Sequence, residues 1–222
     1  MLTSVRFVLV GLVLALVLAG AGPAQAAWDG SYSVFSKGSF SAQVTNYSCV
    51  GASIQMMLNM IRGERDKSST RQLRYWRYAR NHSRYLASNK GADPRGWVLA
   101  LRHFGAGYYR VGKGATMQRA LRKAAKRMRA TAKPVGMLVA SGGHAWVMTG
   151  FQATADPRRT DNFKVTKVQA MGPLYPYGTL DGRRYDPGPR TWIGLRALRQ
   201  KFTAYRWKIA PEWHGLWITI NP

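Results

Sequence analysis

The sequence predicts an α+β fold in which a helical N-terminal half packs on an antiparallel β-sheet. Up to Pro134 the apolar residues recur mainly at helical spacing, and beyond it β-branched and aromatic runs dominate. Helices followed by strands, rather than alternating with them, are typical of α+β domains. The contents of 46% hydrophobic and 12% aromatic residues are those of an ordered chain.

Residues 1–26 have the pattern of a cleaved signal peptide. Arg6 precedes an apolar run over 7–19, Pro23 follows it, and an A-x-A pattern predicts cleavage after residue 26. The run is shorter than the roughly 20 apolar residues that a transmembrane helix needs. We therefore expect a secreted or extracytoplasmic protein in which residues 27–222 form a single domain.

The first half of this domain is expected to hold three helices in succession. Residues 28–42 are read as irregular or as a short strand. The first helix begins at Cys49, where apolar residues recur at helical spacing until Gly63. A basic, weakly amphipathic helix is expected over 69–86. Asp93, followed by a proline at the first helical position, caps the third.

A fourth helix, capped by Thr116, is strongly basic. Its apolar stripe consists of Met117, Ala120, Leu121, Ala124 and Met128, and its other faces carry Arg119, Arg122, Lys123, Lys126, Arg127 and Arg129. This pattern indicates a solvated surface helix or a ridge that binds anions or a membrane surface.

Strands are expected mainly in the second half. They are predicted over 108–111, 135–139, 145–151, 163–168 and 216–220, with a short helix over 195–202. If the hairpin loop is centred near residues 158–159, His144 lies opposite residues 172–173.

The cysteine and histidine contents limit the chemistry. Cys49 is the only cysteine, which excludes an intramolecular disulfide and a multi-cysteine zinc site. Such a thiol is either an inert buried group or a nucleophile. His82, His103 and His214 lack carboxylate or cysteine companions at ligand spacing, so no metal and no cofactor is expected.

The charge indicates an anionic partner. The chain has 34 basic and 9 acidic residues, a net charge of +25 at pH 7. A field of this size attracts anionic cell-envelope polymers, anionic membrane surfaces and nucleic acid, or it keeps an exported protein soluble. Charge alone does not choose among them.

Three segments of the sequence follow one another in an order that points to a catalytic site. Gln43 precedes Cys49 by six positions, residues 133–139 form an apolar segment that begins with Lys-Pro, and His144 opens an apolar strand after two glycines. Together they resemble the peptidase C39-like family of the papain-like superfamily, over residues 43–173. The resemblance implies a papain-like fold with Cys49 as nucleophile, His144 as base and the Gln43 amide as a donor to the oxyanion.

These roles are physically consistent. A thiol at a helix N-terminus is close to the positive end of the helix dipole, which stabilises a thiolate, and a nearby imidazolium stabilises it more strongly. The Gln43 amide, together with the backbone N–H of Cys49, would hold the charge that develops on a carbonyl oxygen. Gly142 and Gly143, next to His144, leave space for a substrate backbone.

The sequence departs from the family in one place. Members usually carry an Asp, commonly followed by Pro, on the strand after the histidine, but here Gly172 and Pro173 occupy that position. Asp156 is followed by Pro, yet by this pairing it lies at the hairpin tip, far from His144. The groups that could orient the imidazole instead are Gln169, Asp181, Asp186 or a backbone carbonyl.

The sequence thus predicts a secreted cysteine hydrolase, a peptidase that acts on a peptide or amide substrate through a Cys49–His144 dyad. A cell-wall amidase of another cysteine family would leave Gln43 unexplained. The alternative is a catalytically inactive C39-like module that holds an anionic envelope component through its basic helices. The net charge of +25 and the departure at Gly172 favour this alternative.

Overall fold

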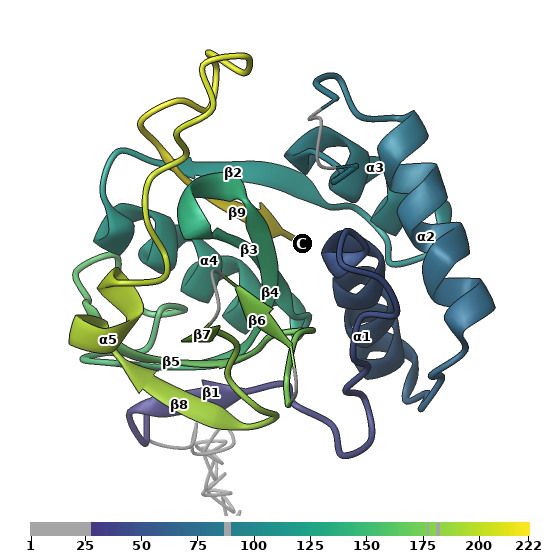
Figure 1. The fold of residues 1–222 in the computed structure, drawn as a ribbon. Coiled ribbons are helices and arrows are strands. Elements are labelled where there is room, and N and C mark those ends of the chain that lie inside the picture. Colours follow the sequence, from purple (N-terminus) through teal and green to yellow (C-terminus); the bar gives the residue numbers. More distant parts are fainter. Residues whose placement is uncertain (1–27, 87–89, 177, 181–182) are drawn as a thin grey trace, which may run out of the picture.

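The computed structural model describes residues 28–86, 90–176, 178–180 and 183–222. In these residues three N-terminal helices pack on a seven-stranded antiparallel sheet (Figure 1), so the predicted α+β class is confirmed. The expected signal peptide, residues 1–26, lies outside the described residues.

The helices and strands follow the predicted succession. The helices are α1 (Cys49–Arg62), α2 (Ser69–Asn81), α3 (Pro94–His103), α4 (Met117–Thr131) and α5 (Leu195–Arg199), with a 3-10 turn, η1 (Ala140–Gly142). The strands are β1 (Ser31–Ser33), β2 (Arg110–Gly114), β3 (Val135–Val139), β4 (His144–Ala153), β5 (Val165–Met171), β6 (Thr179–Leu180), β7 (Arg183–Arg184), β8 (Thr191–Gly194) and β9 (Trp217–Asn221). None of the helices within the described ranges is long and apolar enough to cross a membrane.

The sheet has the strand order β2-β9-β3-β4-β5-β8, and β1 pairs with the far half of β4. All of these pairs are antiparallel. Strands β6 and β7 form a separate two-stranded hairpin. Strand β4 therefore lies inside the sheet, and it is the strand that begins at His144.

Helices cover both faces of this sheet. Ala145 and Val147 of β4 belong to the apolar cluster built with α1, α2 and α3, whereas Trp146 and Met148 belong to the cluster built with α4. Successive side chains of a strand point to opposite faces, so α4 covers the face opposite the three N-terminal helices. Strand β4 is consequently buried almost throughout, as expected for a strand covered on both faces.

Helices α3 and α4 begin directly after the residues that were predicted to cap them. The Asp93 side chain accepts a hydrogen bond from Gly96 N at 2.7 Å, and Thr116 accepts one from Arg119 N at 3.2 Å. Helix α1 ends at Gly63, whose φ of 69° is in the left-handed region that favours glycine.

Several boundaries differ from the prediction. Helix α2 ends at Asn81 rather than near residue 86, and β2 and β5 begin about two residues later than expected. Strand β8 and the β6–β7 hairpin were not predicted. They are too short to carry a pattern of alternation, and proline and glycine interrupt their surroundings.

The register of the β4–β5 hairpin also differs from the expected one. The ladder runs from Val147–Met171 to Ala153–Val165 with two irregularities, between Met148 and Gly150 and between Gln152 and Ala153. Extending it would set His144 level with Leu174 rather than with residues 172–173. The expectation was wrong by one to two residues, because bulges change the register and leave little trace in the sequence.

Candidate active site

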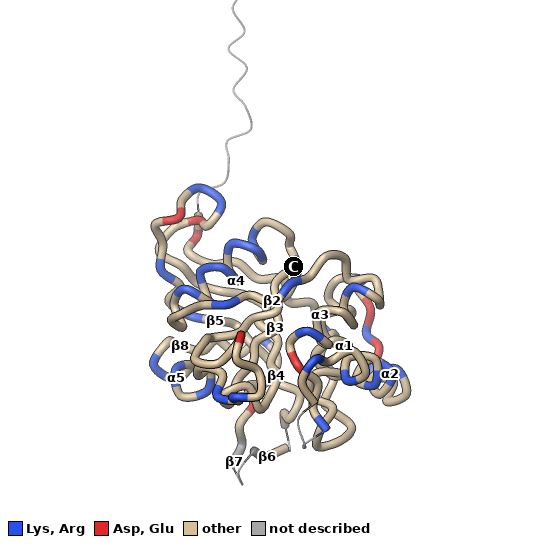
Figure 2. Tube along the Cα trace, turned by 90° about the horizontal axis from the view of Figure 1, so that it is seen from above, with Lys and Arg blue, Asp and Glu red and all other residues tan. Residues whose placement is uncertain are grey.

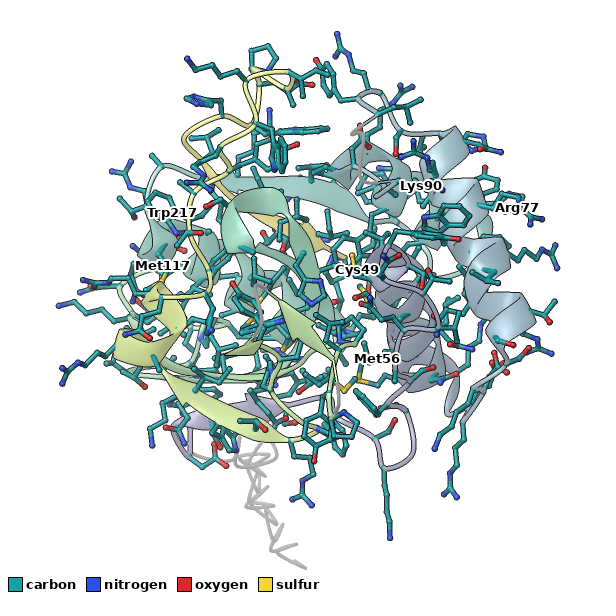
Figure 3. All side chains as sticks on the ribbon, in the orientation of Figure 1. Cys49, Met56, Arg77, Lys90, Met117 and Trp217 are labelled. Carbon is teal, nitrogen blue, oxygen red and sulfur yellow. The ribbon has the colours of Figure 1, made fainter. Side chains whose placement is uncertain are left out.

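Cys49 is the first residue of α1, and Figure 3 shows it at the end of that helix, toward the sheet. The preceding Ser48 does not cap the helix with its side chain. Its hydroxyl instead accepts from Thr45 N at 3.1 Å and donates to Gln72 Oε1 at 3.3 Å. Among the described residues, no side chain caps the first N–H groups of α1, which lie beside a partly exposed thiol.

A buried glutamine holds the segment that leads into Cys49. Gln72 of α2 accepts from Val44 N at 2.8 Å and donates to Ala42 O at 2.9 Å. Helix α2 approaches α1 closely here, since a Cβ on Gly51 would lie 2.6 Å from the Gln72 carbonyl oxygen. The helix pair thus fixes the backbone on either side of Gln43.

Gln43 lies in this fixed segment. Its backbone N–H donates to Pro173 O at 2.8 Å, which ties it to the residues after β5. Its side-chain nitrogen donates to Thr45 O at 2.7 Å, which leaves the second N–H of the amide for another acceptor. Gln43 is not among the residues that line the cavity beside Cys49.

His144 follows a strained turn. Ala140 and Ser141 have φ values of 50° and 55°, and Gly142 has a φ of 91°. Left-handed residues in succession are costly for non-glycine residues and need support from their surroundings. The Ser141 backbone N–H donates to Thr203 Oγ1 at 2.9 Å, and a Cβ on Gly142 would lie 2.3 Å from the Tyr205 ring.

The space at Gly142 is therefore filled by Tyr205 rather than left open for a substrate backbone, which corrects the expectation from the sequence. Gly142 and Gly143 do line the cavity.

Asp186 lies against the imidazole of His144. His144 Nε2 is 2.9 Å from both carboxylate oxygens, and the Asp186 side chain is fully buried. Trp146 Nε1 donates to the same carboxylate at 2.7 Å, and Leu174 N donates at 2.6 Å. His144 and Trp146 are two positions apart on β4 and so share a face. Three donors offset the cost of burying this charge.

The acid that the sequence did not place is thus found at Asp186, one of the four candidates. Gly172 makes room for it, because a Cβ on Gly172 would lie 2.4 Å from the Asp186 Cγ and Oδ2 atoms. The backbone N–H of Gly172 donates to Pro187 O at 3.0 Å. A signal was present in the sequence, since Asp186 is followed by Pro187.

The candidate Gln169, and Asp156, which the sequence placed far from His144, have different partners. Gln169 accepts from Ser33 Oγ at 2.6 Å and from Thr149 Oγ1 at 3.0 Å, while Asp156 pairs with Arg129 at 3.3 Å. Asp181 lies outside the described residues. Within the described ranges no cluster of three or more His, Cys, Asp or Glu side chains is arranged to hold a metal ion.

The environment of His144 favours the imidazolium. Burial lowers the pKa of His144, but hydrogen bonds with Asp186 and Cys49, together with their charges, outweigh burial and raise it to about 9. Asp186 occupies Nε2, so Nδ1 is the ring nitrogen left for the contact with Cys49. The imidazole therefore lies between a sulfur and a carboxylate.

A cavity of about 280 Å³ opens beside these groups, and Cys49 and His144 both line it. Leu138 and Val50 contribute to its lining, and Trp207 and Ile209 of the C-terminal loop also line it. These four side chains are apolar. Asp93 and Lys208 also line the cavity, so it joins apolar walls to a few polar groups.

Polar contacts hold the walls of this cavity. The Asp93 carboxylate accepts from Arg84 N at 2.7 Å and from Tyr85 N at 2.9 Å, in addition to capping α3. The Tyr85 hydroxyl donates to Glu212 Oε2 at 2.8 Å, so the loop before α3 is joined to the C-terminal loop. No local sequence pattern marks Tyr85 or Trp207 as part of the site, because only the fold brings them to the cavity, and Glu212 reaches it through Tyr85.

No family model, curated protein or solved structure matches this chain. The resemblance to the C39-like peptidases and the papain-like fold that it implies stay predictions, which rest on the motifs and on the geometry described above.

Proposed function

We propose that this protein is an exported cysteine hydrolase of papain-like organisation that cleaves a peptide or amide bond. The observation that supports this proposal most directly is that the buried Asp186 carboxylate lies 2.9 Å from Nε2 of His144. The Cys49 side chain, like Asp186, raises the pKa of this imidazole. A nucleophile, a base and an orienting acid in contact form the arrangement that activates a thiol. Export rests on the signal-peptide pattern of residues 1–26.

In the proposed reaction, the Cys49 thiolate attacks the carbonyl carbon and forms the C–S bond. The carbonyl electrons move to oxygen, and the backbone N–H of Cys49 stabilises that oxyanion. The family resemblance gives the Gln43 amide the same role, although Gln43 does not line the cavity itself. His144 then donates its proton to the leaving nitrogen as the C–N bond breaks, which leaves a thioester on Cys49. The neutral imidazole takes a proton from water as the water oxygen attacks the thioester carbonyl. The C–S bond then breaks, the carboxylic acid product leaves, and the Cys49 thiolate and the His144 imidazolium are restored.

Asp186 acts on His144 rather than on the substrate in this proposal. Its carboxylate holds the Nε2–H tautomer, so that Nδ1 faces the sulfur, and it stabilises the imidazolium. This contact removes the reason, drawn from Gly172, for favouring an inactive module. The apolar side chains in the cavity lining, those of Val50, Leu138, Trp207 and Ile209, support a substrate with a bulky apolar group beside the scissile bond.

The experiment that tests the proposal is alkylation of Cys49 by iodoacetamide as a function of pH. Cys49 is the only cysteine, so modification reports on it alone. At pH 6 we expect His144→Ala to slow the reaction by about 100-fold, because a thiol without an imidazolium partner is mostly protonated at that pH. His103→Ala, at an exposed histidine of α3, is the matched control and should react as the parent does.

A thiol that alkylates with the same pH dependence in the parent chain and in His144→Ala would sink the hydrolase proposal. If Cys49 stays reactive at low pH in the control but not in His144→Ala, the next step is to screen electrophilic peptides that carry an apolar residue for covalent attachment to Cys49.

A further inference from the structure

A second concave surface lies at the edge of the sheet, where β2, α4 and the end of β9 meet. It encloses about 530 Å³ and shares no residue with the cavity beside Cys49. Figure 2 shows Lys and Arg positions along α4, on the side of the molecule where the chain ends. The polar residues that line this basic groove are Arg110, Lys113, Lys123, Lys126, Arg127 and Asn221.

The backbone of the chain holds some of these cations in place. Lys123 Nζ donates to Lys113 O at 2.8 Å, and Arg127 Nε donates to Pro222 O at 2.6 Å. Lys126 pairs with Asp161, which is not a lining residue. No acidic side chain among the described residues lines the basic groove, so its lining side chains carry a net positive charge.

Asn221 gives the basic groove a built polar contact. This residue is only 3% exposed, and its Oδ1 atom is buried without a hydrogen-bond partner among the described residues. Its Nδ2 atom faces Gly112, where a Cβ would come within 2.2 Å. Oδ1 is an acceptor and so does not itself favour an anion, whereas Nδ2 is a donor that suits an anion's oxygen.

The lining also indicates which anion fits. No aromatic side chain among the described residues lines the basic groove, so nucleic-acid bases would find no surface to stack on. Its one partly buried apolar side chain, Val111, gives no protruding apolar ridge that could enter a membrane. Several cations along one groove suit a chain of regularly spaced phosphates.

We propose that the basic groove binds a base-free phosphate polymer. Arg110, Lys113, Lys123 and Arg127 contact successive phosphates, and the Asn221 amide donates to one phosphate oxygen. The groove is separate from the cavity of Cys49, so this binding goes beyond the proposed hydrolase function and does not depend on it.

The test measures the affinity of the full chain for inorganic polyphosphate of about 20 phosphates at several salt concentrations. The groove variant is Arg110→Gln/Lys113→Gln, at two exposed residues of the edge strand. Its matched control is Lys67→Gln/Arg77→Gln, which removes the same charge at two exposed positions, one just before α2 and one within it. Figure 3 shows Arg77 projecting outward from that helix.

We expect the groove variant to bind polyphosphate about tenfold more weakly and to reduce the slope against salt by about 1 to 2, while the control changes affinity by less than about twofold. Asn221→Ala should weaken binding about tenfold without a change in that slope, because it removes a neutral donor. Its unfolding midpoint reports whether the fold is retained.

Equal losses in the groove variant and in the control would overturn the proposal, since net charge alone would then explain binding. It would also be overturned if oligo-dT of equal charge, or vesicles of phosphatidylglycerol, bound more tightly than polyphosphate and lost affinity in the groove variant. Those two results would assign the groove to nucleic acid or to a membrane surface.

Discussion

Replacement of Asp186 by Asn tests the candidate active site most directly. Among the described residues, the Asp186 carboxylate and the Cys49 side chain are the groups that raise the pKa of His144. Asn is close to Asp in size, so the packing against Gly172 and the hydrogen bond from Trp146 are retained at least in part. The substitution therefore removes the charge more than the shape.

The size of the effect follows from the pKa of His144, which is about 9 in the folded protein against an ordinary value of 6.5. If the pKa returns to its ordinary value, the imidazolium fraction at pH 8 falls from about 90% to about 3%. Any step that needs the imidazolium, such as proton donation to the leaving group, then slows by about 30-fold at pH 8. Loss of the orienting acid in a hydrolase triad can cost more, up to about 10⁴-fold.

The assay is an NMR titration of the histidine side chains labelled with ¹⁵N. The chain has four histidines, and His144→Gln identifies the signal of His144. We expect a titration midpoint near 9 in the parent protein and a midpoint at least 1 unit lower in Asp186→Asn. This assay requires no substrate.

A His144 midpoint that stays near 9 in Asp186→Asn would refute the reasoning, because the carboxylate would then not control the protonation of the imidazole. A parent midpoint near 6.5 would refute it as well.

Three further predictions concern the same region. Gly172→Ala should displace Asp186, since its Cβ would lie 2.4 Å from the carboxylate, and should lower the His144 midpoint as Asp186→Asn does; Gly194→Ala, where no atom lies within 4 Å, should leave it unchanged in the same titration. Because folding raises the pKa of His144, the stability that its protonation contributes to the fold is complete below pH 6.5 and is lost as the pH rises to about 9. Urea unfolding should therefore show the free energy of unfolding of the parent falling by up to about 3 kcal/mol over that interval relative to His144→Gln. The same pH dependence of this free energy in both proteins would contradict the prediction. Asp93→Ala removes three hydrogen bonds from backbone N–H groups and should lower the free energy of unfolding, measured in urea, by about 2 to 3 kcal/mol. A loss under about 0.5 kcal/mol would show that the Asp93 carboxylate does not hold this part of the cavity wall in place.

Much of the fold could be predicted because its signals are local. Capping by Asp93 and Thr116 acts over three residues, and the apolar stripe of α4 repeats every three to four residues. These patterns set the helix starts and the face that is buried. The short strands β6, β7 and β8 carry no such pattern, because a strand of two to four residues is stabilised by its partners rather than by its own residues.

The residues of the candidate site likewise fall into those that a local pattern marks and those that only the fold brings in. Cys49 at a helix start and His144 at a strand start are each placed by their own element, so the sequence could single them out. The position of Asp186 depends on how the segment after β5 returns to the sheet, which no local pattern encodes. Gly172, just beyond the end of β5, leaves the room that this carboxylate occupies.

By itself, then, the sequence determined the α+β class, the main helices, the unpaired cysteine, the net charge of +25 and the histidine that follows two glycines. Only the tertiary structure decided which acid contacts His144, which loops wall the cavity and which cations line the basic groove. The physical reason is that these contacts join residues far apart in the chain, 42 positions for His144 and Asp186 and 127 for Tyr85 and Glu212, and packing rather than local propensity brings such residues together.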